Sequence, residues 1–292
     1  MVRKAVIPAA GFGTRMLPAA KAVPKEMLPV LDRPTIQYVV EEAAAAGAAD
    51  VLLVTSRDKR AIEDHFDRSP ELESRLASSG KSALLASIDA LMAKVKIHAT
   101  RQAEQKGLGH AVLQARPHVG DEPFLCLLGD TIFSPRTPGA PLPCRQLVDA
   151  YAHLQTPIIG LEQVLPDKVE RYGIVGGAEI SPGVFRLDTL VEKPARASAP
   201  SNLAIAARYV LTPDLFDCLD QTPAGKGGEI QLTDALKLLL ARRPIHGVVL
   251  QSKRHDIGNP VDWLKTNLYL ARKDPTLWRE IVDLVQRMKD EG

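Results

Sequence analysis

The chain has 292 residues, 45% of them hydrophobic and 25% charged, and its formal net charge is +2. Such a chain can bury a sizeable core, as one large α/β domain or two small ones, and its near-neutral charge argues against bulk electrostatic binding to nucleic acid or to a membrane surface. No apolar run approaches the roughly 20 residues of a membrane span, and the short apolar N-terminal stretch ends in glycines, unlike a signal peptide.

The cysteines indicate a reducing compartment. Cys126, Cys144 and Cys218 lie far apart in the sequence and form no CxxC motif. Disulfides and structural zinc are therefore not expected. We expect a cytoplasmic protein that has no nucleic acid or membrane among its partners.

Strands and helices alternate in the first part of the chain. A short apolar run predicts a buried strand over 4–9, and apolar residues on one helical face predict a helix over 35–46. The pattern further predicts strands over 51–55, 95–100 and 123–128, and helices over 60–66, 72–94 (with a break near 78–80) and 109–116. This alternation is typical of an α/β fold with a parallel sheet and right-handed crossovers.

The second part mixes strands and helices less regularly. Residues 134–143 hold four prolines and are expected to form a loop. Beyond them the pattern predicts strands near 157–164, 173–177, 184–192, 204–210 and 245–251, and helices near 213–219, 233–242, 260–272 and 276–289. No internal repeat or low-complexity linker divides the chain.

The segment 11–33 shows neither helical nor strand periodicity, and prolines stiffen it. Long loops inside compact domains are usually functional or disordered, and the prolines favour a functional role. Gly11 and Gly13 directly follow a strand, where glycines let backbone N–H groups approach phosphate oxygens closely. Arg15 can form a bidentate contact with phosphate and Lys25 can act as a point charge, so the loop predicts phosphate binding.

Two common glycine motifs do not match this loop. The dinucleotide fingerprint GxGxxG needs a third glycine where Met16 stands, and no GxxxxGK[ST] sequence occurs. A tight turn without a ligand is the alternative interpretation of Gly11 and Gly13. The spacing of Arg15 and Lys25 favours the phosphate site.

Two aspartates have the positions expected of magnesium ligands. Asp130 follows the apolar strand at 123–128, and Asp256 also follows a strand. Ligands of open α/β sheets lie beyond the carboxyl ends of strands, and Mg²⁺ often takes one or two carboxylates together with phosphate oxygens. A turn or capping role is the alternative for Asp130.

Five motifs occur in order along nearly the whole chain. They are AAGFGTRMLPAAKAVPKEMLPVLDRPTIQYVVEEA (9–43), QKGLGHAV (105–112), VEKPARASAPSNLAIAARYVL (191–211), GGEIQLTDAL (227–236) and HDIGN (255–259). Together they resemble the sugar-nucleotide pyrophosphorylases, a family of nucleotidyltransferases, and among these the bacterial branch that transfers a uridylyl group to glucose 1-phosphate.

The resemblance implies a Rossmann-like α/β nucleotidyltransferase fold with a central mixed, mainly parallel sheet flanked by helices. It implies one domain over 1–292, with a nucleotide-binding part near 1–135, a sugar-phosphate-binding part near 136–260 and C-terminal helices near 261–292. The implied reaction is UTP plus glucose 1-phosphate giving UDP-glucose plus pyrophosphate, with Mg²⁺ as cofactor. The family also suggests a homodimer or homotetramer.

The resemblance also implies roles for individual residues. Nucleotide binding is implied for Ala10, Gly11, Gly13, Thr14, Arg15, Lys25, Glu26, Gln102 and Gly107. Sugar-phosphate binding is implied for Tyr172, Gly173, Glu192, Lys193, Asn202 and Glu229. Catalytic roles are implied for Arg15, Lys25, Asp130 and Lys193, and Mg²⁺ binding for Asp130 and Asp256. An amide such as that of Gln102 offers both a donor and an acceptor to a uracil edge.

The chain departs from the family pattern at a few positions. Gly129 stands where the family usually has proline before the metal aspartate, and Ala207 stands where it has glycine. No departure removes a charged residue assigned above. Three alternatives stay open: the same chemistry with dTTP or another sugar phosphate, a non-catalytic paralogue that binds a nucleotide sugar, and, for Lys193 alone, a solvated surface pair with Glu192.

Overall fold

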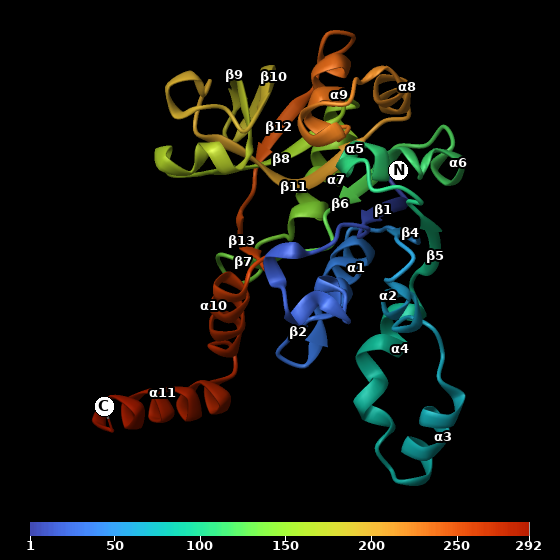
Figure 1. Cartoon of the computed structure of the whole chain (residues 1–292), viewed down its shortest axis with the longest axis vertical. Helices are drawn as coiled ribbons and strands as arrows, with labels where there is room; N and C mark the ends of the chain where they lie inside the picture. Colours follow the sequence, from blue (N-terminus) through green and yellow to red (C-terminus); the bar gives the residue numbers. More distant parts are fainter. Residues whose placement is uncertain (292) are drawn as a thin grey trace.

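The computed structural model describes residues 1–291, and a nine-stranded sheet forms its centre (Figure 1). The strands follow one another across the sheet in this order: β5 (Lys96–Arg101), β4 (Asp50–Thr55), β1 (Lys4–Pro8), β6 (Phe124–Leu127), β11 (Leu203–Leu211), β8 (Ile158–Gln163), β12 (His246–Val249), β10 (Val184–Glu192) and β9 (Gly173–Ser181). Strands from both halves of the chain therefore belong to one sheet, and they meet where β6 pairs with β11.

The sheet is mixed, as predicted, but its two halves differ. The pairs β5–β4, β4–β1 and β1–β6 are parallel, as is β12–β8. The other four neighbouring pairs, β6–β11, β11–β8, β12–β10 and β10–β9, are antiparallel. The expectation of a mainly parallel sheet therefore holds for the first half only, because the strands of the second half include the β9–β10 hairpin.

Helices cover both faces of the sheet. They are α1 (Thr35–Ala45), α2 (Arg60–Asp64), α3 (Pro70–Ser78), α4 (Ala86–Met92), α5 (Gly107–Leu113), α6 (Arg116–Val119), α7 (Pro143–Leu154), α8 (Asp214–Gln221), α9 (Leu232–Leu240), α10 (Pro260–Ala271) and α11 (Pro275–Asp290). Short 3₁₀ helices are η1 (Thr14–Met16), η2 (Ala19–Lys21), η3 (Lys25–Met27), η4 (Ser82–Leu85), η5 (Pro166–Arg171), η6 (Arg196–Ser198) and η7 (Lys226–Gly228).

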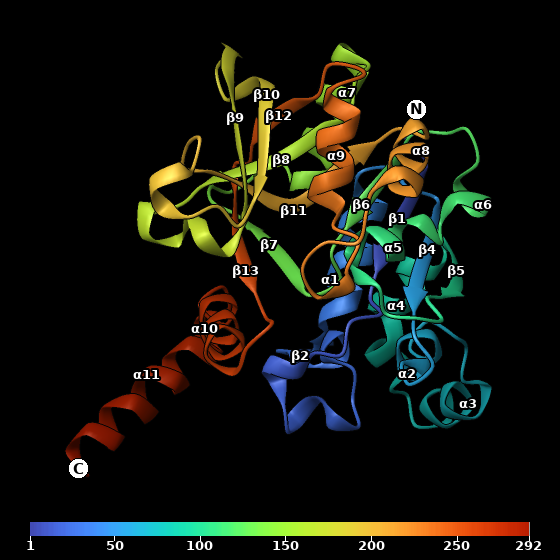
Figure 2. The ribbon, with the colours of Figure 1, turned by 45° about the horizontal axis from the view of Figure 1, so that its top comes forward.

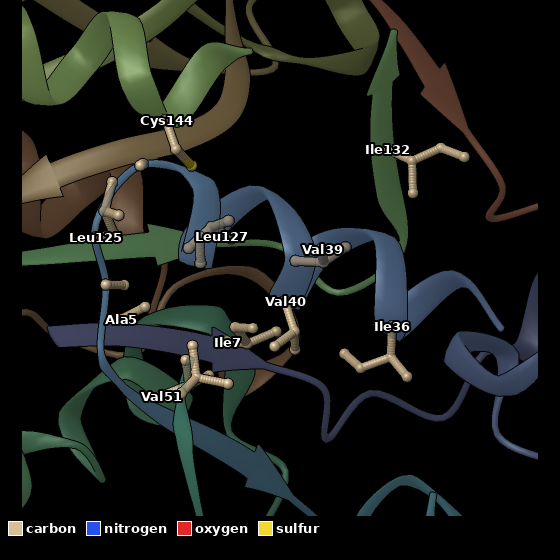
Figure 3. Close-up of a cluster of buried hydrophobic side chains, with 14 of the residues drawn as sticks. Ala5, Ile7, Ile36, Val39, Val40, Val51, Leu125, Leu127, Ile132 and Cys144 are labelled. Carbon is tan, nitrogen blue, oxygen red and sulfur yellow. The ribbon is translucent and has the colours of Figure 1, made fainter. Parts of the chain in front are cut away.

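The core forms two layers because successive side chains of a strand point to opposite faces. Ala5 and Ile7 of β1 join a cluster with α1 and α7, drawn in Figure 3, whereas Val6 between them joins a cluster with α5, α8 and α9. Both layers are built almost entirely from aliphatic residues. Burial on both faces explains why β1 appears in the sequence as a continuous apolar run.

Two elements differ from the sequence-based expectation over 134–143. Ser134 and Pro135 end strand β7 (Thr131–Pro135), which pairs antiparallel with β13 (Ser252–Asp256) as a separate two-stranded ribbon. Pro143 begins α7, a helix for which we made no prediction. Proline is compatible with both places, since it is tolerated at a strand end and in the first turn of a helix. A second small hairpin joins β2 (Pro29–Val30) to β3 (Arg33–Pro34).

The C-terminal helices lead away from the sheet. In Figures 1 and 2, α10 follows β13 and α11 then extends outward, with the C-terminus at its far end. No residue of α11 is buried. Among residues 1–291, no helix has the length and apolar character needed to cross a membrane.

Candidate active site

The first pocket lies beyond the carboxyl ends of β1, β5 and β6. It has a volume of about 440 Å³ and is walled by the glycine loop, the start of η3 and the start of α5. Of the nine predicted nucleotide-binding residues, eight line it: Ala10, Gly11, Gly13, Thr14, Lys25, Glu26, Gln102 and Gly107. Asp130 lines it as well. The predicted phosphate loop and the predicted base-binding residues therefore face one space.

Gly13 fits its position for two reasons. Its φ of 66° lies in the left-handed region that favours glycine. An added Cβ would lie 3.3 Å from Cγ and Cδ of Lys25, so the glycine also lets the lysine side chain pass close by. Gly11 has no atom within 4 Å of an added Cβ, so its backbone is open to a ligand.

Gly107 is fixed by close packing against the segment before α9. Its φ is 91°, and an added Cβ would lie 2.8 Å from both Glu229 Cβ and the Ile230 carbonyl oxygen. The same segment is held by Gly109 N–H, which donates to Ile230 O at 2.8 Å, and by Ile230 N–H, which donates to Lys106 O at 2.7 Å. A side chain at position 107 would push these segments apart.

The second pocket adjoins the first and has a volume of about 230 Å³. Tyr172, Gly173, Glu192 and Lys193, all predicted for the sugar phosphate, line it. Glu192 accepts a hydrogen bond from Thr233 Oγ1 at 2.8 Å. Its other carboxylate oxygen lies 3.3 Å from Lys193 Nζ. The two pockets share the residues Leu108, Leu128, Asp130 and Gln231.

Asp130 and Asp256 lie at the same end of the β7–β13 ribbon. Asp256 is the register partner of Thr131, and Ile257 N–H donates to the backbone oxygen of Asp130 at 3.2 Å. Both aspartates line the second pocket. Arg15 also lines the second pocket rather than the first: an added Cβ at Gly258 would lie 2.8 Å from Arg15 Nη2 and 2.9 Å from Asp256 Oδ1. Three of the four predicted catalytic residues, Arg15, Lys25 and Asp130, thus gather where the pockets meet, and Lys193 lines the second pocket.

Lys25 and Asp130 form an ion pair across this junction, with Nζ 2.5 Å from Oδ2. Burial raises the pKa of the Asp130 carboxyl, but Lys25 and then Arg15 outweigh burial and hold that pKa below its usual value. Burial lowers the pKa of Lys25, while Asp130 and Glu26 raise it above its usual value. Both groups are therefore ionised near neutral pH.

The donor set at the junction fits a magnesium ion. Two carboxylates, those of Asp130 and Asp256, face one pocket, and Mg²⁺ is commonly held by one or two carboxylates plus substrate phosphate oxygens. Within residues 1–291 no group of three or more His, Cys, Asp or Glu side chains is arranged to bind a metal. A metal here would therefore take its remaining ligands from substrate and water.

Glu26 has a partner that the sequence analysis missed. Lys59 donates to both Glu26 oxygens, at 2.9 and 2.8 Å, and both side chains are almost fully buried. Burial raises the pKa of Glu26 against the opposing charge of Lys59, and burial lowers the pKa of Lys59. This ion pair ties the segment that carries Lys25 to Lys59, and Glu26 also lines the first pocket.

Two predicted sugar-site residues lie elsewhere. Asn202 lines a separate hollow beside the β9–β10 hairpin, and its backbone oxygen accepts from Val164 N–H at 3.0 Å. Glu229 lines the first pocket and accepts from Gln231 Nε2 at 2.8 Å. Asn202 was placed by a linear motif, and the motif does not reveal that its strand begins outside the pocket.

The sequence analysis also missed several polar residues in the pocket walls, among them Gln105, Arg171 and Arg254. Gln105 lines the first pocket and donates to Ala10 O at 2.8 Å, and Arg171 and Arg254 line the second. The Arg254 guanidinium pairs with Glu162 at 2.6 Å and lies 4.4 Å from the centre of the Tyr172 ring. Arg171 directly precedes the predicted residue Tyr172, and Arg254 directly precedes the motif at 255–259. This adjacency is the signal that could have found them.

Known proteins are similar to this chain over nearly its whole length. The model of the family described as nucleotidyl transferase matches residues 4–273. A Bacillus subtilis protein named UTP–glucose-1-phosphate uridylyltransferase is 48% identical over 285 residues, which cover 98% of this chain and 96% of that protein.

Solved structures agree. A UTP-bound UGPase from Acinetobacter baumannii has 38% identity and a TM-score of 0.90, with coverage of 98% of this chain and 99% of that one. A UDP-glucose pyrophosphorylase complexed with UDP-glucose has 39% identity and a TM-score of 0.86, with coverage of 94% and 100%. The α/β architecture, the glycine loop after β1 and these similarities lead to one conclusion: the chain belongs to the nucleotidyl transferase family.

Proposed function

We propose that the protein catalyses the reaction of UTP with glucose 1-phosphate to give UDP-glucose and pyrophosphate. The observation that carries this proposal is the meeting of two pockets at Asp130, one walled by the glycine loop and one by Glu192 and Lys193. A nucleoside triphosphate in the first pocket and a sugar phosphate in the second would bring their phosphates to this junction. The names of the similar proteins support the same choice of substrates.

The chemistry is an in-line displacement at the α-phosphorus of UTP. An oxygen of the glucose 1-phosphate phosphate forms the new bond to phosphorus, and the bond from that phosphorus to the β-phosphate bridging oxygen breaks, releasing pyrophosphate. The nucleophile is already an anion, so no group has to remove a proton. Catalysis then consists of positioning and charge stabilisation.

The cations of the junction match this need. Both substrates are polyanions that repel each other, and we assign Arg15 and Lys25 to the triphosphate and Lys193 to the sugar phosphate. Glu192, oriented by Thr233, is assigned to the sugar hydroxyls. Backbone N–H groups at Gly11 and Gly13 are assigned to phosphate oxygens, for which the open space beside Gly11 leaves room.

We assign Mg²⁺ to Asp130 and Asp256. When bound, it would supply positive charge to the phosphate oxygens and help to align them. Lys25, the ion-pair partner of Asp130, would contact phosphate at the same place. The whole described chain would act as one catalytic domain, with the nucleotide part near 1–135 and the sugar-phosphate part near 136–260.

The test is pyrophosphate release with glucose 1-phosphate and Mg²⁺, offering UTP, dTTP, CTP, ATP and GTP separately. We expect a strong preference for UTP and no release when glucose 1-phosphate is omitted. Asp130→Asn should abolish most Mg²⁺-dependent turnover in folded protein. Absence of turnover with every nucleotide would overturn the proposal in favour of a non-catalytic binding protein.

We also propose a homodimer or homotetramer that works in the cytoplasm. Large apolar side chains are exposed on the last two helices, namely Val261, Leu264, Leu268, Val282, Leu284, Val285 and Met288. Exposed apolar patches of this kind often mark protein interfaces. Deleting residues 275–292 should lower the number of subunits per particle, obtained from the mass measured by light scattering divided by the mass of one chain. An unchanged number of subunits would remove α11 from the interface. The unpaired cysteines are consistent with the cytoplasm.

A further inference from the structure

His110 in α5 lies beside the amide of Gln102, at the wall of the first pocket. The Gln102 side chain is nearly buried, and its Nε2 lies 3.0 Å from the Gly107 carbonyl oxygen and 2.9 Å from His110 Nδ1. The Gln102 backbone is fixed as well, because its N–H donates to Thr55 O at 2.9 Å. Backbone and amide are therefore both held before a ligand arrives.

These contacts decide which way the amide faces. A backbone carbonyl can only accept a hydrogen bond, so the NH₂ group of Gln102 must be the one that faces Gly107. Its second N–H then points at His110 Nδ1, which must be the unprotonated nitrogen of the ring. Gln114 Nε2 also lies near the ring, 3.3 Å from His110 Nε2, but it already donates to the His110 carbonyl oxygen at 3.2 Å. A neutral imidazole has one acceptor nitrogen, and the shorter contact of 2.9 Å to Gln102 assigns it to Nδ1 and the ring proton to Nε2.

The oxygen of Gln102 is left for the pocket. Among the described residues this oxygen has no hydrogen-bond partner. Every fully buried side-chain oxygen or nitrogen among those residues does have a partner. The Gln102 oxygen is therefore not fully buried, and it is accessible. Gln102 lines the first pocket, so that is the space it reaches. The pocket therefore presents an acceptor, and not a donor, at this point.

We propose that His110 is a specificity-determining residue that acts through Gln102. By accepting from Nε2, it holds the amide with its oxygen toward the nucleobase. An acceptor there pairs with the N3–H of uracil or thymine and opposes the unprotonated N3 of cytosine. His110 is a positioning residue, since the base contacts Gln102 and not the histidine. This inference rests on the proposed use of UTP.

The test compares UTP with CTP in one protein. His110→Phe keeps a ring of similar size but removes the acceptor, so the amide of Gln102 can also present its NH₂ group to the pocket. Since one hydrogen bond contributes roughly 0.5–1.5 kcal/mol, the ratio of kcat/KM for UTP to that for CTP should fall by about threefold to tenfold. Calorimetry with each nucleotide should show the same fall in the ratio of Kd values.

The ratio of kcat/KM for UTP to that for CTP distinguishes a positioning role of His110 from a merely structural one. Loss of folded protein lowers both rates equally and leaves the ratio unchanged. His118→Phe is the matched control, because His118 pairs with Asp50 at 2.8 Å outside both pockets, and its ratio should stay at the wild-type value. His110→Leu is the second variant if the phenylalanine does not fit.

The outcomes are distinct. An unchanged ratio in both His110 variants, with UTP turnover intact, would overturn the role of His110 and leave the proposed function standing. A wild-type protein that uses no UTP would overturn both. A fall in the ratio that also appears in His118→Phe would show a general effect of the helix and would count against the proposal.

Discussion

At the scale of single residues, Ala207 adopts a backbone conformation that suits glycine better. Its φ is 57°, it sits at the register shift of β11, and it lines the second pocket. A non-glycine residue in the left-handed region costs roughly 1 kcal/mol or more, partly offset by the greater entropy that glycine has in the unfolded chain.

Ala207→Gly should therefore raise the free energy of unfolding by up to about 1 kcal/mol, measured by denaturant titration. Ala206→Gly is the control, because Ala206 is fully buried and its φ is not positive, and this variant should be destabilised. A destabilised Ala207→Gly would contradict the conformation described here.

Lys193 has a strained backbone conformation and an exposed side chain. Its φ is 44°, its N–H donates to Tyr172 O at 3.0 Å, and its side chain is 59% exposed, so packing does not explain why the strained backbone is kept. Strained residues held by their surroundings are frequent at ligand sites.

Lys193→Ala should raise the KM for glucose 1-phosphate about tenfold or more and leave the KM for UTP nearly unchanged, because one charge-assisted contact contributes roughly 1.5–3 kcal/mol. Steady-state kinetics with each substrate varied in turn measures both. Arg196→Ala, a nearby exposed cation outside the second pocket, is the control. An unchanged KM for the sugar phosphate would remove Lys193 from the site.

Asp130 links stability to pH. Its folded-state pKa is lowered by Lys25 and Arg15 despite burial, so its ionised form stabilises the fold at pH values above the unfolded pKa of about 3.9. This contribution is lost as the pH falls through the lower, folded-state pKa. Wild type should be more stable than Asp130→Asn at pH 7, and the difference should shrink below about pH 4. Urea titrations across this range measure it, and a difference independent of pH would contradict the assignment.

At the scale of secondary-structure elements, Arg208 of β11 joins the strand to α1 and to the loop that carries Asp130. The side chain is fully buried and contacts both oxygens of Glu42 at 2.8–3.1 Å. It also donates to Thr131 O at 2.7 Å and to Leu128 O at 3.4 Å, the carbonyls on either side of Gly129 and Asp130. One guanidinium therefore holds both ends of the loop that carries Asp130.

Removing one partner of the Arg208–Glu42 pair should destabilise the fold. Glu42→Ala leaves Arg208 buried and unpaired, and should lower the free energy of unfolding by about 3–5 kcal/mol. The double variant Arg208→Met with Glu42→Leu should recover most of the stability and yet raise the Mg²⁺ concentration for half-maximal activity, since the two carbonyls lose their donor. A double variant with wild-type Mg²⁺ dependence would show that other contacts position Asp130.

The elements that the sequence predicted best are those with their own periodicity. The buried strand at 4–8 and the helix at 35–45 were found within one residue at their ends. The β7–β13 ribbon was missed because each strand is held by a partner more than a hundred residues away and one of them runs into a proline-rich segment. Helix α7 was missed although Cys144, Leu147 and Val148 show helical spacing, because the prolines before it dominated the interpretation.

The residues of the candidate site also fall into those that a local sequence pattern identifies and those that only the folded structure reveals. Gly13, Lys25 and Lys193 were identified because each stands within a short motif, and Asp130 because it follows an apolar strand. The structure brings all four to adjoining pockets. Arg208, Lys59 and His110 were not, because their partners Glu42, Glu26 and Gln102 become neighbours only after folding. A contact of this kind leaves no local signal in the sequence.

At the scale of the whole molecule, both pockets are built on one continuous sheet. The first pocket lies over the parallel strands and the second over the antiparallel ones, and β6 and β11 hydrogen-bond where the halves meet. A continuous hydrogen-bonded sheet offers no flexible linker between the pockets. Under the proposed function, the sheet therefore sets the distance between the two substrate phosphates, and adjustment on binding is left to loops such as 11–13.

The reactivity of the three cysteine thiols can report how the two core layers on either side of this sheet open. Cys144 lies in one layer of the core and Cys126 and Cys218 in the other, all fully buried, and burial raises the pKa of each thiol, to about 12 for Cys126. The thiolate is the form that attacks alkylating reagents, so the buried thiols of the native state should react far more slowly than a free thiol. Mass spectrometry of the three cysteine-containing peptides would measure the alkylation rate of each thiol. These rates would report the opening of each core layer separately, without an engineered label. Rapid labelling of Cys144 in native protein would contradict the packing of α7.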